Sequence, residues 1–316
     1  MAVSAFAPAS IGNVSVGFDI LGAALAPIDG TKLGDTVEIY DSDESFTLEN
    51  AGAFADKLPS DPKKNIVYDC YVDFKAELEK RGIAVKNMRM VLKKDLPIGT
   101  GLGSSACSVV AACLALNAFH GSPLTEDECM GLMGREEGRI SGSVHYDNVA
   151  PCYLGGIQLI IDEGGVISSR VPEFKDWFWV SCYPGIFVST AEARKILPTS
   201  YDRHTSIDFA RRMGAFVQAS HVGNAKLAAM MLKDVIAEPY RKSLIPGFDA
   251  AREHVTNNGG LAMGISGSGP SIFAVAPNLE TANALKTWLE NNFIQNSDGF
   301  CNVCRIDSDG ATVNNI

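Results

Sequence analysis

The stretch Pro97-Ile-Gly-Thr-Gly-Leu-Gly-Ser-Ser-Ala106 is the most informative segment of this 316-residue chain. Its three glycines allow the backbone to approach a bulky partner and to enter turns that other residues avoid. The residues that follow, 104–120, include no charged side chain, proline or glycine, which predicts a helix buried within a domain. We expect Ser104 or Ser105 to cap this helix, whose first N–H groups lack intrahelical partners. Such a helix start binds anions, so the stretch predicts a phosphate site, with a purely structural turn as the alternative.

Two general phosphate-binding motifs fit this stretch poorly. The P-loop pattern is excluded because the chain contains no Gly-Lys pair. The dinucleotide fingerprint is formally met by Gly101, Gly103 and Ala106, but Pro97 interrupts the strand that must precede it. Its expected acidic residue, Glu126, lies inside Thr125-Glu-Asp-Glu128, which has the pattern of a helix capping box. A dinucleotide-binding domain is therefore disfavoured.

Composition indicates a cytoplasmic protein of one large or two ordinary domains. The net charge of −10 and the absence of a basic cluster disfavour nucleic acid as a partner. The longest apolar run is shorter than the roughly 20 residues that a bilayer requires, and no Lys or Arg precedes Lys32 as a signal peptide would require. Eight scattered cysteines suit buried, reduced thiols, and we interpret the lone Cys301-Asn-Val-Cys304 as structural rather than as a zinc or redox site.

The hydrophobic pattern predicts an α+β protein, because strands joined by hairpins alternate with helical crossovers. We expect helices over 66–82, 104–120, 125–137, 189–198, 207–222, 224–234 and 278–292. Expected strands are a hairpin over 36–49, a strand over 87–92 that leads to the glycine stretch, one over 153–161, two within 178–189, one over 272–276 and a last one over 301–306. The polar loop 198–206 is a candidate lid.

Three blocks of the chain resemble the motifs of one kinase superfamily. PIGTGLGSSA, residues 8–19 (PASIGNVSVGFD) and residues 264–270 (GISGSGP) are similar to the motifs of GHMP kinases, the galacto-, homoserine, mevalonate and phosphomevalonate kinases. The block over 8–19 and the block over 145–151 (HYDNVAP) resemble the homoserine kinase branch in particular. The resemblance implies a ribosomal-S5-like N-terminal domain over 1–152, a ferredoxin-like C-terminal domain over 153–316, and a site between them.

The resemblance also implies how ATP and Mg²⁺ are held. The nucleotide would contact Asn65 in the polar loop before the first helix, together with the phosphate loop residues Pro97, Ile98, Gly99, Thr100, Gly101, Leu102, Gly103, Ser104, Ser105 and Ala106. Glu137 lies eight residues before His145, as in the homoserine kinase pattern. With the Ser105 hydroxyl it would hold Mg²⁺, which commonly takes one or two protein oxygens and completes its shell with phosphates and water.

The implied substrate site uses charged and amide side chains. Its expected members are Asn13, Asp19, His145, Thr190, Arg194, Arg241 and Gly267; those assigned to catalysis are Asn13, Glu137, Asn148 and Arg194. Arg194 and Arg241 would grip a carboxylate and Asp19 an ammonium group, whereas turn formation is the simpler explanation for Asn13 and Asp19. Asn148 stands where some relatives have an Asp base, so transfer would depend on positioning and charge stabilisation.

The resemblance thus implies an ATP-dependent kinase acting on the side-chain hydroxyl of L-homoserine to give O-phospho-L-homoserine in threonine biosynthesis. We expect small-molecule substrates, no membrane partner and, as one assembly state, a homodimer. A mevalonate or sugar kinase is disfavoured because the Asp base and an N-terminal Lys are missing. A catalytically silent, ligand-binding regulator of the same fold is disfavoured because Glu137, Ser105 and the glycine loop are intact.

Overall fold

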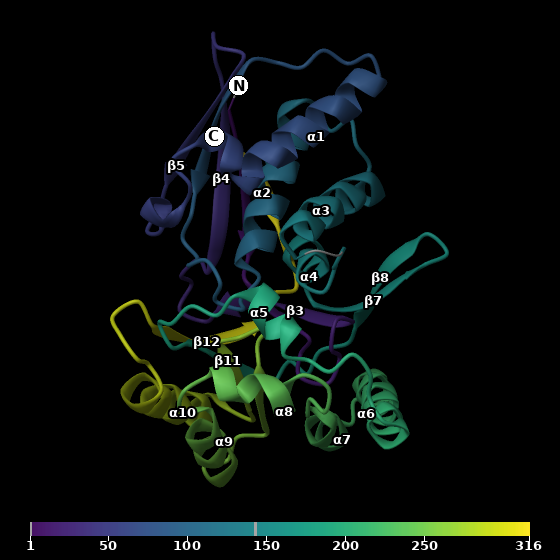
Figure 1. Ribbon diagram of the computed structural model, residues 1–316, viewed down its shortest axis with the longest axis vertical. Helices are drawn as coiled ribbons and strands as arrows, with labels where there is room; N and C mark the ends of the chain where they lie inside the picture. The colour runs from purple at the N-terminus through teal and green to yellow at the C-terminus, as the bar shows by residue number, and fades with distance from the viewer. Residues whose placement is uncertain (1, 142–143) are drawn as a thin grey trace.

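A computed structural model describes residues 2–141 and 144–316 and consists of two sheets with helices packed on them (Figure 1). The first sheet has five strands in the order β13-β1-β4-β6-β5. Its strands are β1 (Ala2–Pro8), β4 (Gly34–Asp41), β5 (Phe46–Ala51), β6 (Met88–Lys93) and β13 (Thr312–Asn315). All neighbours are antiparallel except β5 and β6, which are parallel.

The second sheet has eight strands and forms the other half of the molecule. Its order is β10-β11-β9-β12-β3-β7-β8, and the short β2 pairs with β3 beside this path. Its strands are β2 (Ser10–Gly12), β3 (Leu21–Pro27), β7 (Ile157–Glu163), β8 (Val166–Val171), β9 (Phe178–Tyr183), β10 (Ala262–Ile265), β11 (Ile272–Ala276) and β12 (Phe300–Ile306). The β7–β8 hairpin extends away from the body of the molecule (Figure 1).

Helix α2 (Ser104–Phe119) is the centre of the first half. It packs on β1 and β4, while α1 (Ile66–Lys80) and α3 (Glu126–Ser141) pack on it. Fourteen of its residues are buried, which explains why its sequence is apolar on every side. The shorter α4 (Val149–Leu154) follows, and two single-turn helices, η1 (Ala55–Lys57) and η2 (Pro62–Lys64), precede α1.

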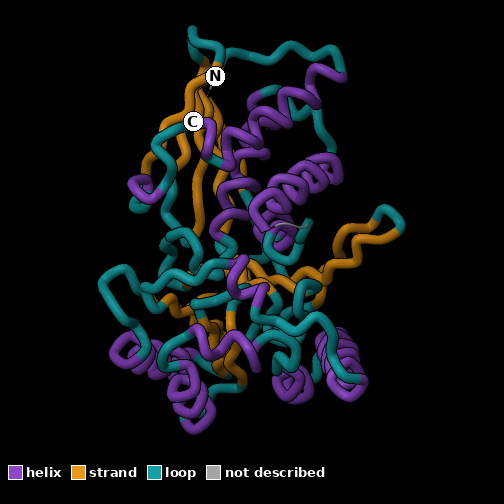
Figure 2. The backbone as a smooth tube through the Cα atoms, viewed as in Figure 1, coloured by secondary structure: helices purple, strands orange, loops and turns teal. Residues whose placement is uncertain are grey.

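The second half carries most of its helices on one side of its strands (Figure 2). The helices are α5 (Thr190–Lys195), α6 (Arg203–His221), α7 (Ala225–Met231), α8 (Glu238–Arg241), η3 (Lys242–Leu244), α9 (Phe248–Asn257) and α10 (Leu279–Asn292). Helix α10 packs on β9, β11 and β12, and α6 packs on α7. None of the helices in the described part of the chain is long and apolar enough to cross a bilayer.

The α+β class is confirmed, but several expected elements are wrong. Residues 36–49 do not form a hairpin, because β4 pairs with β1 and β6 while β5 joins the far side of β6. The expected strand over 153–161 begins only at Ile157, since the preceding residues form α4. Residues 178–189 hold one strand, β9, rather than two, and α6 begins at Arg203, which shortens the candidate lid loop.

The two halves exchange strands. Strand β3, early in the chain, lies in the second sheet, and β13, late in the chain, pairs with β1 in the first sheet. The sequence pattern predicted that β12 is the last strand, but β13 follows it. The division of the chain at residues 152 and 153 stays a prediction.

Candidate functional site

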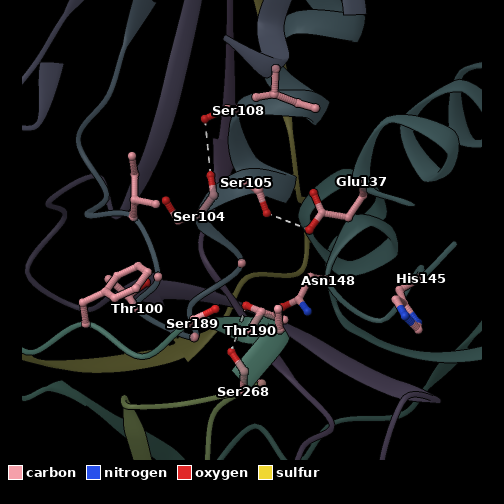
Figure 3. A pocket seen from close by; sticks show the side chains of 18 of the residues that line it. Thr100, Ser104, Ser105, Ser108, Glu137, His145, Asn148, Ser189, Thr190 and Ser268 are labelled. Atoms are coloured by element: carbon pink, nitrogen blue, oxygen red, sulfur yellow. Dashed lines mark hydrogen bonds between the residues drawn. The ribbon is translucent and has the colours of Figure 1, made fainter. Parts of the chain in front are cut away.

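A cavity of about 390 Å³ lies between the two halves, at the start of α2. Loops from both halves line it, including the segment before α1, the glycine loop, the start of α5 and the loop after β10. Figure 3 shows Ser104, Ser105 and Glu137 above Asn148, with Thr190 and Ser268 below it and His145 to one side. The cavity is thus where the sequence motifs converge.

Gly103 caps α2, which corrects the expectation that Ser104 or Ser105 does so. Gly103 has a φ of +66°, in the left-handed region, and Ser104 already belongs to the helix. A Cβ at Gly103 would lie 2.2 Å from Ser10 Oγ and 3.0 Å from Asn148 Oδ1, so no side chain fits there. The two serines instead stand in the first turn, where their N–H groups face the cavity end of the helix.

The three sequence motifs hold one another by hydrogen bonds. Ser266 Oγ donates to Gly101 O at 2.7 Å, and the Ser271 N–H donates to Thr100 O at 3.0 Å. A Cβ on Gly101 would lie 2.4 Å from Ser266 O, which explains the glycine there. Asn13 Nδ2 donates to Gly267 O at 3.0 Å. Glycine in the phosphate loop and in the loop after β10 therefore serves the close approach of two backbones.

Ser105 and Glu137 face each other across the cavity wall. Ser105 Oγ donates to Glu137 Oε1 at 2.6 Å, from α2 to α3 (Figure 3). Burial raises the pKa of Glu137, while the Ser105 hydrogen bond and the charge of Lys94 act in the opposite direction. A carboxylate and a hydroxyl side by side at a helix N-terminus fit a hard cation bound together with phosphate oxygens. The two residues predicted as Mg²⁺ ligands are thus in contact, and their role in binding the metal stays a prediction.

Asp19 and Arg194, predicted to bind opposite ends of a substrate, bind each other in this structure. Arg194 donates from Nη1 and Nη2 to the two carboxylate oxygens of Asp19, both at 3.1 Å. Arg241 is buried; its Nε donates to Ala193 O at 2.9 Å and its Nη1 to Gly267 O at 3.0 Å. All three side chains line the cavity. A ligand that carries both charges can therefore meet a preformed anion and cation.

Asp147 lines the cavity but was not predicted from the sequence, unlike its neighbours His145 and Asn148. Its carboxyl is buried, and burial together with the negative charges of Asp19 and Glu137 raises its pKa to about 7. Asn148 Nδ2 donates to Asp147 Oδ2 at 3.2 Å. Burial lowers the pKa of His145, which is partly buried. A carboxyl that ionises near neutrality can bind a cation or accept a proton.

A buried lysine lies behind the phosphate loop and was also missed. Lys94 Nζ contacts Asp35 Oδ2 and donates to Ser104 O at 2.8 Å and to Ser108 Oγ at 3.1 Å. Both charged groups are almost fully buried, and Lys94 reaches the cavity. The alternation of Met88, Met90 and Leu92 was the available signal, because the next residue on that buried face is Lys94.

The remaining predicted residues divide into two groups. Ile98, Gly99, Thr100, Asn65, Thr190 and Gly267 line the cavity, whereas Pro97, Leu102 and Ala106 do not. Asn65 caps α1 by accepting the Val67 N–H at 3.1 Å, so it has a structural role as well. Thr190 Oγ1 lies 3.2 Å from Ser268 Oγ. Phe187, an exposed aromatic on the cavity rim, carried no signal in the sequence.

Comparison with known proteins identifies the family. Models of the N-terminal and C-terminal domains of GHMP kinases match residues 65–156 and 213–295. Homoserine kinase from Cytophaga hutchinsonii is 31% identical, with a TM-score of 0.88 over 99% of this chain and 97% of that chain.

Two further structures are less similar in sequence. A Listeria monocytogenes protein provisionally described as a homoserine kinase gives a TM-score of 0.72 at 21% identity, over 99% of this chain and 100% of that one. Mevalonate kinase from Methanococcus jannaschii gives 0.69 at 17% identity, over 97% and 98%. These two show the fold alone. The 31% identity over nearly the whole of both chains, with both domain models matched, places this protein in the GHMP kinase family.

Proposed function

We propose that this protein is a homoserine kinase, which uses ATP to phosphorylate the side-chain hydroxyl of L-homoserine. The observation that carries the proposal is the Asp19–Arg194 ion pair, which lies in the same cavity as the glycine loop and the Ser105–Glu137 pair. An amino acid brings one carboxylate and one ammonium group, which match one cation and one anion. Mevalonate has no ammonium group, and a neutral sugar has neither charge.

The phosphates of ATP would rest at the start of α2. Gly103 and the first turn of the helix supply unpaired N–H groups and the positive end of the helix dipole. Ser105 and Glu137 would hold Mg²⁺, which supplies charge neutralisation at the transferring phosphoryl group when it is bound. Lys94, which is paired with Asp35, lies behind the same turn and donates to its Ser104 carbonyl.

The homoserine hydroxyl would lie near Asn148, between the phosphate end and the charged end of the cavity. Arg194 and Arg241 would bind the substrate carboxylate, and Asp19 its ammonium group, so that the hydroxyl points at the γ-phosphate. Asn13 supports this arrangement by joining the first and third motifs, since its Oδ1 also accepts the Asp19 N–H at 2.8 Å. Orientation of this kind can supply a large share of the acceleration of phosphoryl transfer.

A coupled ADP-release assay tests the substrate. We expect ATP turnover with L-homoserine well above that with L-serine, mevalonate or galactose. A preference for mevalonate or galactose would contradict the assignment of homoserine and identify a different substrate for the kinase. Absence of turnover with all four, combined with ATP binding, would favour the silent regulator.

A variant of the metal site tests whether the turnover arises in this cavity. Glu137→Gln keeps the shape of the side chain but removes its charge, and an amide is a much poorer ligand for a hard cation. We therefore expect an intact fold and a large loss of kcat. A loss of only a few-fold at saturating Mg²⁺ would remove Glu137 from this role.

The proposal extends to the compartment, the assembly state and the domain boundaries of the protein. We infer a cytoplasmic enzyme of amino-acid biosynthesis, with ATP and homoserine as its partners and a homodimer as its assembly state. The N-terminal domain would span residues 1–152 and the C-terminal domain 153–316. Size-exclusion chromatography with light scattering tests the assembly state.

A further inference from the structure

Asn148 is held from two sides within the cavity wall. Ser10 Oγ donates to Asn148 Oδ1 at 2.8 Å, and Asn148 Nδ2 donates to Asp147 Oδ2 at 3.2 Å. If the amide were reversed, its oxygen would face the Asp147 carboxyl, and whenever Asp147 is ionised the two acceptors would repel each other. The contacts on both sides therefore favour one orientation of the amide.

Ser10 itself is fixed by its surroundings. It lies on β2, is fully buried, and its backbone N–H donates to Leu102 O at 3.1 Å. Cys152 Sγ donates to Ser10 Oγ at 3.4 Å, so the hydroxyl has both a donor and an acceptor partner. Its oxygen lies 2.2 Å from the place where a Cβ of Gly103 would stand. The hydroxyl thus has little freedom to leave Asn148.

We propose that Ser10 is a positioning residue for phosphoryl transfer, because its hydroxyl holds Asn148 Oδ1 and leaves the Nδ2 N–H groups on the Asp147 side of the cavity. In this orientation Asn148 offers a hydrogen-bond donor to a substrate oxygen and not an acceptor for the hydroxyl proton. Ser10 does not line the cavity and acts through Asn148. The inference deepens the proposed function and rests on it for the substrate.

The test is a double-mutant cycle in the full-length protein. In Ser10→Ala the amide loses its partner, and we expect kcat to fall on the order of ten-fold, with KM for ATP changed less than about two-fold. If Ser10 acts through Asn148, adding Ser10→Ala to the Asn148→Ala variant lowers kcat no further. Losses that multiply in the double variant would overturn the proposal.

Two further variants separate positioning from packing. Ser10→Cys keeps a weaker donor of similar shape, so we expect its kcat to lie between those of the wild type and Ser10→Ala. Ser181→Ala is the matched control, because Ser181 on β9 is as buried as Ser10, does not line the cavity and has no hydrogen-bond partner for its hydroxyl within the described structure. It should leave kcat unchanged.

A purely structural role for Ser10 has a different signature. If Ser10 only supports Gly103, then Ser10→Ala raises KM for ATP and lowers the melting temperature while kcat stays constant, and the proposal fails. If the wild type phosphorylates another alcohol in place of homoserine, the same cycle is measured with that alcohol. Failure of the substrate assignment therefore does not decide the role of Ser10.

Discussion

Asp147 is a buried carboxyl whose ionisation bears on how the ammonium group of an amino-acid substrate binds. Its raised pKa, about 7, has burial as its main cause, followed by the nearby charges of Asp19 and Glu137. The neutral form dominates below this pH and the carboxylate above it. Because a carboxylate attracts an ammonium group more strongly than a neutral acid does, we expect kcat/KM for homoserine to rise with pH through about 7. The pH dependence of kcat/KM reports the ionising groups of the free enzyme.

Asp147→Asn provides the comparison for this profile. The amide cannot ionise, so the rise near pH 7 should disappear while the fold is kept. A variant that retains the same rise would assign it to another group, with His145 next to be tested. Burial lowers the pKa of His145.

Arg194 and Asp19 should govern substrate affinity rather than nucleotide affinity. The pair is bidentate, and Lys cannot reproduce the two parallel N–H bonds of the guanidinium group. About a third of each side chain remains exposed, so we expect a moderate effect, a rise of roughly ten-fold in KM for homoserine in Arg194→Lys. KM for ATP should stay constant.

A substrate without a carboxylate is the control for Arg194. 3-Aminopropan-1-ol should react poorly with the wild type and should be unaffected by Arg194→Lys. If KM for ATP rises in place of KM for homoserine, Arg194 does not bind the substrate carboxylate.

The predictions made from the sequence differ most from the structure at single buried charged residues. The glycine loop was predictable because its glycines and the apolar helix after it form a long, specific pattern. Glu137 and Ser105 were predictable from the resemblance, and they are in contact in the structure. Asp147 and Lys94 were missed, because one charged residue carries no periodic signal and its burial depends on partners far along the chain. Asp35, for example, lies 59 residues from Lys94.

At the scale of elements, the junction of the glycine loop with α2 depends on Gly103. A methyl group there would collide with Ser10 Oγ and would also require a left-handed backbone at a non-glycine residue. We therefore expect Gly103→Ala to weaken ATP binding measured by calorimetry and to lower the melting temperature.

Gly214→Ala is the matched control in another helix. Gly214 lies within α6, and a Cβ there meets no atom within 4 Å. This variant should stabilise the protein by roughly 0.5–1 kcal/mol without changing ATP binding. Equal ATP affinity in Gly103→Ala and Gly214→Ala would contradict the phosphate-binding role of the loop.

The contact between α1 and α3 contains a carboxyl pair that makes stability depend on pH. Glu136 is fully buried, and burial, with Asp73 close by, raises its pKa to about 8. Arg139 bonds both carboxylates, at 3.0 Å and 2.9 Å. Since the folded state binds this proton more tightly than the unfolded state, the free energy of unfolding should fall as pH rises from about 4.5 to about 8. The lowered pKa of Asp73 acts only in more acidic solution.

Glu136→Gln isolates this effect. The amide mimics the protonated carboxyl, so the variant should lose this part of the decline in melting temperature between pH 5 and pH 8. Urea unfolding at several pH values measures the same slope. An unchanged slope would place the proton on another group.

Element boundaries were predicted better than strand partners. Helices α1, α2, α5 and α10 begin and end close to the predicted residues, because caps and apolar periodicity are local signals. The expected hairpin over 36–49 failed because β4 and β5 are adjacent in sequence but separated by β6 in the sheet. Residues 149–154, expected to lead into a strand, form a helix that buries four of its six residues against the first half.

At the scale of the whole molecule, β13 ties the end of the described chain to its beginning. It pairs with β1 over four residues, from Val3 with Asn315 to Phe6 with Thr312. Truncation after residue 311 would leave the N–H and C=O groups of this β1 edge unpaired. We expect a lower melting temperature and more aggregation on heating, measured by light scattering, with little change in KM for either substrate at 25 °C. An unchanged melting temperature would show that β13 is dispensable.

This strand exchange has a consequence for synthesis on the ribosome. Strands β1, β4 and β6 are complete once residue 93 has been translated, but β13 begins at residue 312, which is 219 residues later. At 5–20 residues per second, the nascent chain would expose an open β1 edge for roughly 10–45 s. Strand β3 is likewise translated long before its partners β7 and β12. The first half therefore folds with this edge of β1 open while the second half is being made, and we expect this edge to be where the nascent chain is most prone to pair with other chains.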